Sequence, residues 1–386
     1  MLLNNYKVYG LNIKSEIKID EFENLNAIPE DEIVTISYSV MDDEIKKSVS
    51  EGRKIQLQKE KIWFHIDNIA TYCIKNGNKV EVEVCENANM QLMKIYIMCS
   101  CLGFIMLQRD MVAIHGGVIE MDNNAVIFTG DRGAGKSTLT TALREKGYKF
   151  ISDDVAGIMF DKVPYVMPGF PYQKLCESAM DKFGYDKEAF TSFMSDKEVK
   201  YVVPAIDEFV NEKRELVSIV KLTVGDVDEV TIEELRGSEK LNNIIENIYR
   251  GEYIKHLGKM DPIYFKQCVD IAKNIRFFKI TRPANKFTVD EQIDNVDALI
   301  EKNKELKKGL MQTLLTKGIG HTKFKKTEIG EIPEEWEVKE LDLIGEIITG
   351  STPKTSEKDN YGNEYLWVSP GDLGIKKYVT NTVKML

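Results

Sequence analysis

Apolar and polar residues alternate in short runs over the first 90 residues of the chain. Four such runs are YKVYGLNI, IVTISYSV, IWFHI and KVEVEV. A period of two is typical of strands that bury one face, so we predict an antiparallel sheet in this region. The residues Asn76-Gly77-Asn78, between TYCI and KVEVEV, have the composition of a tight hairpin turn.

Helical spacing replaces this alternation between residues 89 and 109. Apolar side chains recur there every four residues, at Met93, Ile97, Cys101 and Ile105. This pattern predicts a largely buried helix. The longest apolar run, residues 95–107, is interrupted by cysteine, serine and glycine and is shorter than a membrane span, so we expect no membrane partner.

From Val112 the predicted order is strand, turn, strand, glycine-rich loop, helix and strand. The strands are VAIHGGVIEM, AVIFTG and YKFISDD, and the helix is KSTLTTALREKG. Since this helix is long enough for the crossover between two parallel neighbours, AVIFTG and YKFISDD are predicted to be adjacent and parallel. Their carboxyl ends would then lie at the same edge of the sheet.

The second half of the chain contains weaker signals and then a change of character. Residues 165–200 are rich in aromatics and are predicted to be irregular, with PGFP as a turn before a short helix. Strands are predicted in LVSIVKLTV, DEVTIEEL and IRFFKITRP, and helices at 238–249 and 262–273. From Val296 a long amphipathic helix follows, DALIEKNKELKKGLMQTLL, and then a lysine-rich connector.

Charge and cysteine content narrow the class of protein. The net charge of −10 argues against nucleic-acid binding by the whole chain, although residues 301–328 carry eight lysines and three acids. The six cysteines form no CxxC pair, which argues against a zinc site or a disulfide framework. With no signal-peptide pattern at the N-terminus, we expect a cytoplasmic protein.

The glycine-rich loop TGDRGAGKST has the spacing of a phosphate-binding (Walker A) loop. Gly130, Gly133 and Gly135 let the backbone turn around a phosphate, Lys136 reaches the β and γ oxygens of ATP, and Ser137 is a candidate Mg²⁺ ligand. The predicted nucleotide-binding residues are Gly130, Asp131, Arg132, Gly133, Ala134, Gly135, Lys136, Ser137 and Thr138.

Two carboxylates follow the next strand, at Asp153 and Asp154. At the edge predicted above they would face a bound triphosphate, where one could hold Mg²⁺ and the other accept a proton from an attacking hydroxyl. The alternative is a solvated turn, because aspartate is a common turn residue. His115, in VAIHGGVIEM, is likewise open to two interpretations, a core histidine or a catalytic one, and Gly116 and Gly117 beside it leave room for a closely approaching group.

In this combination the residues resemble the HPr serine kinase/phosphorylase family, and more closely its relatives in peptide-modification gene clusters, including lasso-peptide precursor kinases. The similar segments run in order from about residue 5 to 295; they are VYGLNIKSEI, LQRDMVAIHGGVIE, GDRGAGKSTL, KGYKFISDD, PGFP, LNNIIENIYR and IRFFKITRP. The resemblance implies an α/β fold in which a β-rich N-terminal region precedes a phosphate-loop kinase core.

The resemblance also implies roles for individual residues. His115, Asp153 and Asp154 would belong to the catalytic centre together with Lys136. Asp154 would be the general base, Asp153 a Mg²⁺ ligand or a group that orients the hydroxyl, and His115 would act near the transferred phosphoryl group. The segment PGFPYQKLCE differs from the Glu-Ile-Arg-Gly-Leu-Gly segment of the carbon-regulation enzymes, and Lys174 within it is open to two interpretations: a phosphate-neutralising group or a solvated lysine.

The C-terminal stretch resembles a different family, the specificity subunits of type I restriction systems. KELKKGLMQTLLTKGIGHTKFKKTEIGEIPEEWEV is similar to their helix and connector, and ITGSTPKTS to the opening of a target-recognition domain. We expect a truncated fragment, left by a gene fusion or a misjoined reading frame, and do not expect DNA to be a partner.

These patterns lead to one leading hypothesis and two alternatives. The leading one is an ATP- and Mg²⁺-dependent serine kinase acting on a peptide or small protein, with a homo-oligomer left open. The alternatives are a module that binds or hydrolyses ATP without transfer, and a DNA-recognition fragment. The predicted segments are 1–110 (β-rich, ending in the buried helix), 111–297 (kinase core), 298–328 (helix and basic connector) and 329–386 (recognition-like fragment).

Overall fold

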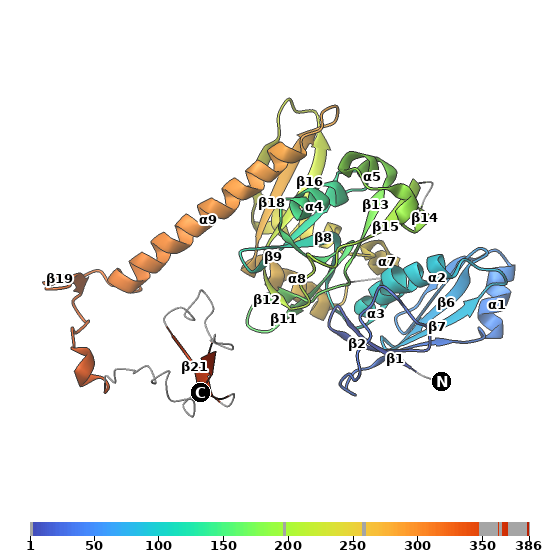
Figure 1. The fold of residues 1–386 in the computed structure, drawn as a ribbon, viewed down its shortest axis with the longest axis horizontal. Helices are drawn as coiled ribbons and strands as arrows, with labels where there is room; N and C mark the ends of the chain where they lie inside the picture. Colours follow the sequence, from blue (N-terminus) through green and yellow to red (C-terminus); the bar gives the residue numbers. More distant parts are fainter. Residues whose placement is uncertain are drawn as a thin grey trace. The chain divides into compact units, whose positions relative to one another are not determined.

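The computed structural model describes residues 3–195, 198–256, 260–346, 362, 365–369 and 384–385. The chain separates into two compact units, Met1–Asn303 and Lys304–Leu386, and each is described by itself. The first unit is mixed α/β, and Figure 1 shows its sheets and helices. The segments predicted at 1–110 and 111–297 both lie within it.

A seven-stranded sheet forms the N-terminal part of the first unit, in the order β1-β2-β3-β7-β6-β5-β4. The hairpin turn predicted at Asn76-Gly77-Asn78 joins β6 to β7, and Asn76 and Gly77 have the positive φ angles that such a turn needs. The sheet is not wholly antiparallel as predicted, because β3 runs parallel to both of its neighbours. The strands are β1 (Asn4–Val8), β2 (Leu11–Ser15), β3 (Val34–Tyr38), β4 (Ile55–Leu57), β5 (Lys61–Ile66), β6 (Ala70–Lys75) and β7 (Lys79–Val84), with α1 (Asp43–Ser50) after β3.

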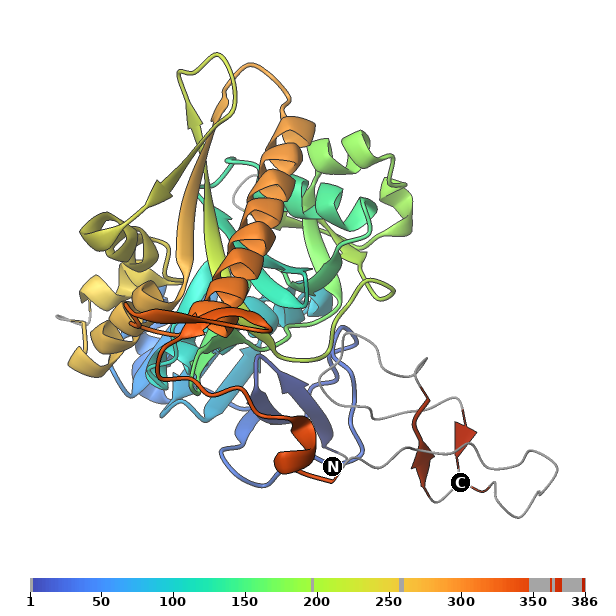
Figure 2. The ribbon, with the colours of Figure 1, turned by 90° about the vertical axis from the view of Figure 1, so that its left-hand side faces the viewer.

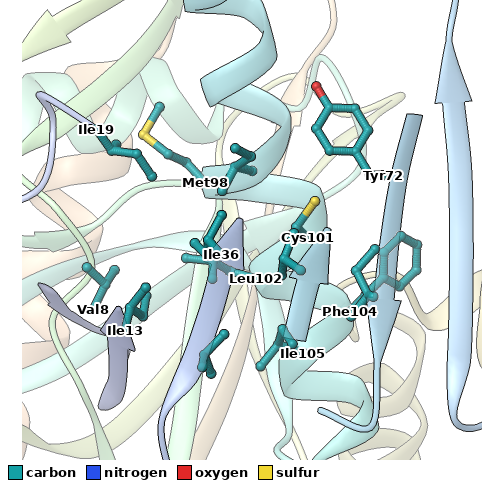
Figure 3. Packing of buried hydrophobic residues seen from close by; sticks show 14 of the residues in the cluster. Val8, Ile13, Ile19, Ile36, Tyr72, Met98, Cys101, Leu102, Phe104 and Ile105 are labelled. Carbon is teal, nitrogen blue, oxygen red and sulfur yellow. The ribbon is translucent and has the colours of Figure 1, made fainter. Parts of the chain in front are cut away.

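The helix predicted between residues 89 and 109 is present and packs on this sheet. It consists of α2 (Met90–Tyr96), a π-helical turn η1 (Ile97–Cys101) and α3 (Leu102–Gln108). The side chain of Asn89 caps its start by accepting a hydrogen bond from the backbone N–H of Leu92. Figure 3 shows Met98, Cys101, Leu102, Phe104 and Ile105 among buried residues of the strands, Val8, Ile13, Ile36 and Tyr72.

This helix is longer than the apolar run that the sequence indicated. Over residues 90–108 it is long and apolar enough to cross a membrane, but two thirds of the apolar window is buried inside the unit. A core helix of a soluble protein has these properties because it is covered on most sides. The structure is therefore consistent with a soluble protein, and the cytoplasmic location stays a prediction.

A second, larger sheet carries the glycine-rich loop. Its strands run in the order β10-β8-β11-β12-β16-β18-β17, and β9 pairs with both β8 and β16. The strands predicted in LVSIVKLTV, DEVTIEEL and IRFFKITRP are confirmed as β16, β17 and β18. The bounds are β8 (Ala113–Met121), β9 (Asn124–Gly130), β10 (Lys149–Ser152), β11 (Val155–Phe160), β12 (Pro164–Val166), β16 (Arg214–Gly225), β17 (Thr231–Leu235) and β18 (Arg276–Pro283).

The strands before and after the loop helix α4 (Lys136–Glu145) are not neighbours, which corrects the prediction. Strand β8 lies between β9 and β10 and is antiparallel to both. The reason is local: the two-residue turn Asp122–Asn123, with both φ angles positive, folds β8 back onto β9. Because β9 and β10 both oppose β8, they still point the same way, so their carboxyl ends do lie at one edge of the sheet.

Helices cover both faces of this sheet (Figure 2). On one face α6 (Gly237–Glu246), α7 (Gly251–His256) and α8 (Pro262–Asn274) bury residues such as Ile244 and Ile271 against Ile127 and Phe277. On the other face lie α4 and the start of α9 (Val289–Lys317). The helix predicted from Val296 therefore begins earlier, and its first turns belong to the core through Val289, Ile293 and Val296.

The region predicted to be irregular, residues 165–200, contains a third sheet. Strands β13 (Tyr172–Cys176), β15 (Glu198–Pro204) and β14 (Ser192–Ser195) pair in that order. The predicted short helix is α5 (Glu177–Phe183), followed by the 3₁₀ turn η2 (Lys187–Ala189). The prediction missed this sheet because its strands are short and only Leu175, Tyr201 and Val203 bury large side chains in its own core.

The second unit contains the hairpin of β19 (Phe324–Thr327) and β20 (Gly330–Pro333). The 3₁₀ turn η3 (Leu341–Leu343) follows, and β21 (Leu366–Trp367) pairs with β22 (Lys384–Met385). Most of the recognition-like fragment predicted at 329–386 falls outside the described residues.

Candidate active site

The glycine-rich loop leaves β9 at Gly130 and enters α4 at Lys136. Gly130, Gly133 and Gly135 all have positive φ angles, which glycine adopts without strain. At Gly130 a Cβ atom would lie 2.2 Å from the carbonyl oxygen of Leu222, so any other residue would collide with β16. The predicted backbone curl is therefore present, at the N-terminus of a helix that follows a buried strand.

Lys136 is half-buried and turned onto its own loop. Its Nζ atom donates to the carbonyl oxygens of Gly130, at 2.7 Å, and Asp131, at 3.1 Å. Burial lowers its pKa, and the negative charge of Asp154 opposes this shift. When a phosphate binds, the Lys136 ammonium can replace these two carbonyl acceptors with phosphate oxygens, so that few hydrogen bonds are lost.

Arg282, at the end of β18, donates hydrogen bonds to two carbonyl oxygens of the glycine-rich loop. The sequence analysis did not identify this residue. Its Nε donates to the carbonyl oxygen of Ala134 at 3.0 Å and its Nη2 to that of Gly133 at 3.2 Å. These contacts engage two carbonyl oxygens of the loop. This arginine belongs to no sequence motif. It stands out in the sequence only as the residue before the proline that ends IRFFKITRP.

The two aspartates lie at a kink between β10 and β11, where both strands pair with β8. Ser152 is opposite Val118 and Val155 is opposite His115, so Asp153 and Asp154 face Gly117 and Gly116. Asp154 has a left-handed φ of 57°, and its carbonyl oxygen accepts a hydrogen bond from the N–H of Gly116 at 3.0 Å. The solvated-turn interpretation is wrong, because Asp153 is only 4% exposed.

The glycines opposite this kink are required by close packing. A Cβ atom on Gly116 would lie 2.4 Å from the carbonyl oxygen of Phe128, and one on Gly117 would lie 3.0 Å from the Thr140 methyl group. The sequence analysis interpreted these glycines as room for an approaching group. The structure fills that room with β9 and α4 of the same chain.

The two carboxyl groups differ in their electrostatic surroundings. Burial, and then the charge of Asp154, raise the pKa of Asp153 to about 7. Burial also opposes the ionisation of Asp154, but the ammonium of Lys174 and then His115 outweigh it and hold its pKa well below the usual range. Adjacent residues therefore present one carboxylate that is firmly ionised and one whose charge depends on its partners.

Lys174 contacts both aspartates from β13. Its backbone N–H donates to Asp153 Oδ2 at 3.0 Å, and its Nζ atom forms an ion pair with Asp154. The same Nζ lies 3.0 Å from Cys99 Sγ in the π-helical turn η1. With a side chain only 10% exposed, Lys174 is not the solvated lysine that the sequence allowed.

His115 is half-buried at the start of β8, next to the aspartate kink. Its N–H donates to the carbonyl oxygen of Asn247 at 2.8 Å, and its carbonyl oxygen accepts from the Thr129 hydroxyl at 2.7 Å. Its ring meets that of Tyr249 edge-on, with centroids 5.8 Å apart. Burial lowers its pKa, and the negative charge of Asp154 opposes this shift.

The structure thus brings the predicted catalytic residues together. The charge of Asp154 acts on the pKa values of both His115 and Lys136, which places the three groups in one electrostatic environment. Among the described residues, no group of three or more His, Cys, Asp or Glu side chains converges.

Comparisons with known proteins divide between two families. No protein-family profile matches the chain. Over 58 residues the chain is 45% identical to the type I restriction enzyme MjaIX specificity subunit of Methanocaldococcus jannaschii, which covers 15% of this chain and 13% of that subunit. Over 98 residues it is 40% identical to the MjaVIII specificity subunit of the same organism, covering 25% and 23%. The chain therefore spans less than a quarter of the length of these relatives.

One solved structure that matches part of the chain is the Hpr(Ser) kinase/phosphatase from Coxiella burnetii. It covers 51% of this chain and 98% of its own, with 13% identity and a TM-score of 0.25. The specificity-subunit matches weaken the expectation that DNA is not a partner.

Proposed function

We propose that the protein is an ATP-dependent kinase that transfers the γ-phosphoryl group to a serine hydroxyl of a peptide or small protein. One arrangement carries the proposal: the glycine-rich loop at the start of α4 shares a sheet edge with the buried Asp153 and the half-buried Asp154. A loop alone would support only ATP binding. The neighbouring carboxylates add the proton acceptor that transfer to a hydroxyl needs.

In this proposal the loop binds the phosphates through its backbone N–H groups and the N-terminus of α4. Lys136 leaves the carbonyl oxygens of Gly130 and Asp131 and contacts the β and γ phosphates. Ser137 and Asp153 would hold Mg²⁺, which when bound supplies positive charge to the phosphate oxygens. Asp153 fits this role because a cation beside it would offset the burial that now disfavours its charged form.

Asp154 would accept the proton of the serine hydroxyl. The hydroxyl oxygen forms a bond to the γ phosphorus while the bond from that phosphorus to the β–γ bridging oxygen breaks, and ADP leaves. By pKa alone Asp153 is the better base, since its value is near neutrality. Accessibility favours Asp154, whose side chain is 27% exposed, whereas Asp153 is 4% exposed and a cation would lower its pKa.

The test is transfer from γ-labelled ATP to a serine-containing peptide by wild type, Asp154→Asn and Asp153→Asn. We expect Asp154→Asn to bind ATP normally while transfer falls by about 10²- to 10⁴-fold, because the amide cannot accept the proton. A larger loss in Asp153→Asn with little loss in Asp154→Asn would exchange the two roles. Free ATP hydrolysis without label on any serine would favour the alternative, an ATP-hydrolysing module.

A ribosomally made precursor peptide is the acceptor that the sequence resemblance suggests. Such a peptide would be tested first, with a serine-to-alanine version of the same peptide as the control. Label on both versions would show that the acceptor is not serine. Whether the active form is a homo-oligomer would be read from its mass in solution at the assay concentration.

A second candidate function, DNA recognition, is favoured by the matches to restriction specificity subunits. The basic segment 301–328 would supply phosphate contacts. Binding of a DNA duplex that weakens steeply with salt, and that is lost when residues 304–386 are removed, would support it. No retention at low salt would leave the kinase proposal as the sole one.

A further inference from the structure

Two consecutive residues of β13, Gln173 and Lys174, connect the helix of the glycine-rich loop to the aspartate pair. Gln173 is fully buried against α4. Its Nε2 donates to the Thr140 hydroxyl at 2.7 Å, and its Oε1 accepts from the Thr141 hydroxyl at 3.0 Å and from Arg144 at 2.8 Å. The position of β13 is therefore fixed relative to α4 by a buried polar network.

Lys174, the next residue, projects toward the aspartates instead of α4, as alternation along a strand requires. One residue then contacts both carboxylates, through its backbone N–H to Asp153 and its ammonium to Asp154. The two adjacent carboxylates are therefore held by two different groups of the same residue, the backbone N–H and the ammonium of Lys174. Like charges so close together would otherwise repel, and each side chain would have a choice of rotamers.

The ammonium of Lys174 is not placed to serve as a phosphate ligand. It is engaged by Asp154 on one side and by Cys99 Sγ at 3.0 Å on the other, and its side chain is nearly buried. The loop lysine, Lys136, already supplies an ammonium beside the glycine-rich loop. The Lys174 ammonium therefore contacts Asp154 and Cys99 within the protein.

We propose that Lys174 is a positioning residue of the phosphoryl-transfer site, which orients Asp154 as the proton acceptor and ties its location to the nucleotide-binding helix through Gln173. The inference rests on the proposed kinase function. In this proposal, β13 fixes the position of Asp154 relative to the glycine-rich loop. Lys174 would act through Asp154 and would make no contact with ATP.

The test measures kcat and the ATP dissociation constant of the full chain for Lys174→Met, Lys174→Arg, Asp154→Asn and the double variant Lys174→Met/Asp154→Asn. We expect Lys174→Met to lower kcat by about 10- to 100-fold, the usual effect of removing a group that orients another, with ATP affinity within about twofold of wild type. Lys174→Arg keeps the charge and should recover part of the loss. The matched control is Lys187→Met, which removes a surface ion pair to Asp181 and should leave kcat unchanged.

The double variant separates positioning from a structural role. If Lys174 acts through Asp154, then Lys174→Met should cause almost no further loss of kcat in the Asp154→Asn background. Additive losses in the double variant, or weakened ATP binding in Lys174→Met, would overturn the inference. The double variant also leaves no Asp154 carboxylate without its ammonium, so it is expected to fold even if Lys174→Met does not.

Failure of this inference can be told from failure of the proposed function. Wild-type protein that neither binds nor consumes ATP would overturn both. If the wild type hydrolyses ATP without transfer, the same variants are measured by hydrolysis. Normal turnover in the wild type together with equal turnover in Lys174→Met would overturn only the role of Lys174.

Discussion

Asp153 and Asp154 are neighbours in the chain, yet the fold gives them different chemistry. Asp153 faces the interior and receives one backbone N–H from Lys174, whereas Asp154 receives the whole ammonium of that lysine. A hydrogen bond from a neutral group stabilises a carboxylate less than a full positive charge does. In the proposed function, this difference between two identical residues would let Asp153 hold Mg²⁺ while Asp154 acts as the base.

The surroundings of Asp153 predict a pH-dependent stability. Its pKa is raised to about 7 in the folded state, so the folded protein binds more protons than the unfolded chain between about pH 4 and 7, and stability falls as the pH rises through that window. We expect Asp153→Asn to remove this fall, so that its free energy of unfolding, relative to wild type, rises by on the order of 3 kcal/mol from pH 4.5 to 7.5.

Chemical denaturation at several pH values, without ATP or Mg²⁺, measures this effect. Asp181→Asn is the control, because it makes the same change at an exposed carboxylate of α5. Parallel curves for wild type and Asp153→Asn would contradict the expected protonation of Asp153.

Among the secondary-structure elements, the strands β13 and β18 constrain the loop and its helix from two sides. Lys174 and Gln173 connect β13 to the aspartates and α4, and Arg282 at the end of β18 engages the loop carbonyls. The π-helical turn η1 adds a third contact, through Cys99 to Lys174. Single-turn π segments occur often at functional sites, and this one brings an element of the N-terminal part to the candidate active site.

The role of Arg282 can be measured by substitution. In Arg282→Ala the carbonyls of Gly133 and Ala134 lose their donors, so the loop should sample more conformations and the dissociation constant for ATP should rise about tenfold. The control is Arg276→Ala on the same strand, which removes an ion pair to Glu234 away from the loop. The affinity is measured by isothermal titration with ATP. An unchanged affinity in Arg282→Ala would show that the contacts of Arg282 with the loop carbonyls do not affect ATP binding.

The whole molecule is organised around a first unit whose boundary falls inside α9. The start of this helix is part of the core, since Val289, Ile293 and Val296 pack on the same face of the sheet as α4, while the second unit begins at Lys304. A cut before α9 would therefore expose an apolar face of the sheet, and a cut after Asn303 keeps the side chains that cover it.

Truncation tests this boundary. The fragment 1–303 should unfold cooperatively and bind ATP like the full chain. The fragment 1–288 loses three buried aliphatic side chains, which together stabilise the fold by roughly 5 kcal/mol, and we expect it to be unfolded or strongly destabilised. Thermal unfolding by circular dichroism distinguishes them, and equal melting temperatures for both fragments would show that α9 contributes nothing to the core.

Local patterns predicted most of the elements around the candidate site. The glycine-rich loop, α4, β16 to β18 and the buried helix 90–108 follow from signals that act within a few residues: glycine at positive φ, apolar periodicity and capping. The position of β8 between β9 and β10, the small sheet around β13 and the parallel direction of β3 were missed. They depend on which strands meet across the chain, and a strand's own residues do not specify its neighbour.

The sequence by itself determined the groups at the candidate site, from the loop glycines and Lys136 to His115 and the two aspartates, because their order and spacing follow the strand–loop–helix pattern. Only the tertiary structure decided their electrostatic states and partners. Lys174 and Arg282 carried no motif, and they lie far along the chain from the groups they contact. Burial and charge pairing arise only when strands that are distant in sequence come together. For this reason the local pattern could not predict the ionised Asp154, the raised pKa of Asp153 or the contacts of Arg282 with the loop carbonyls.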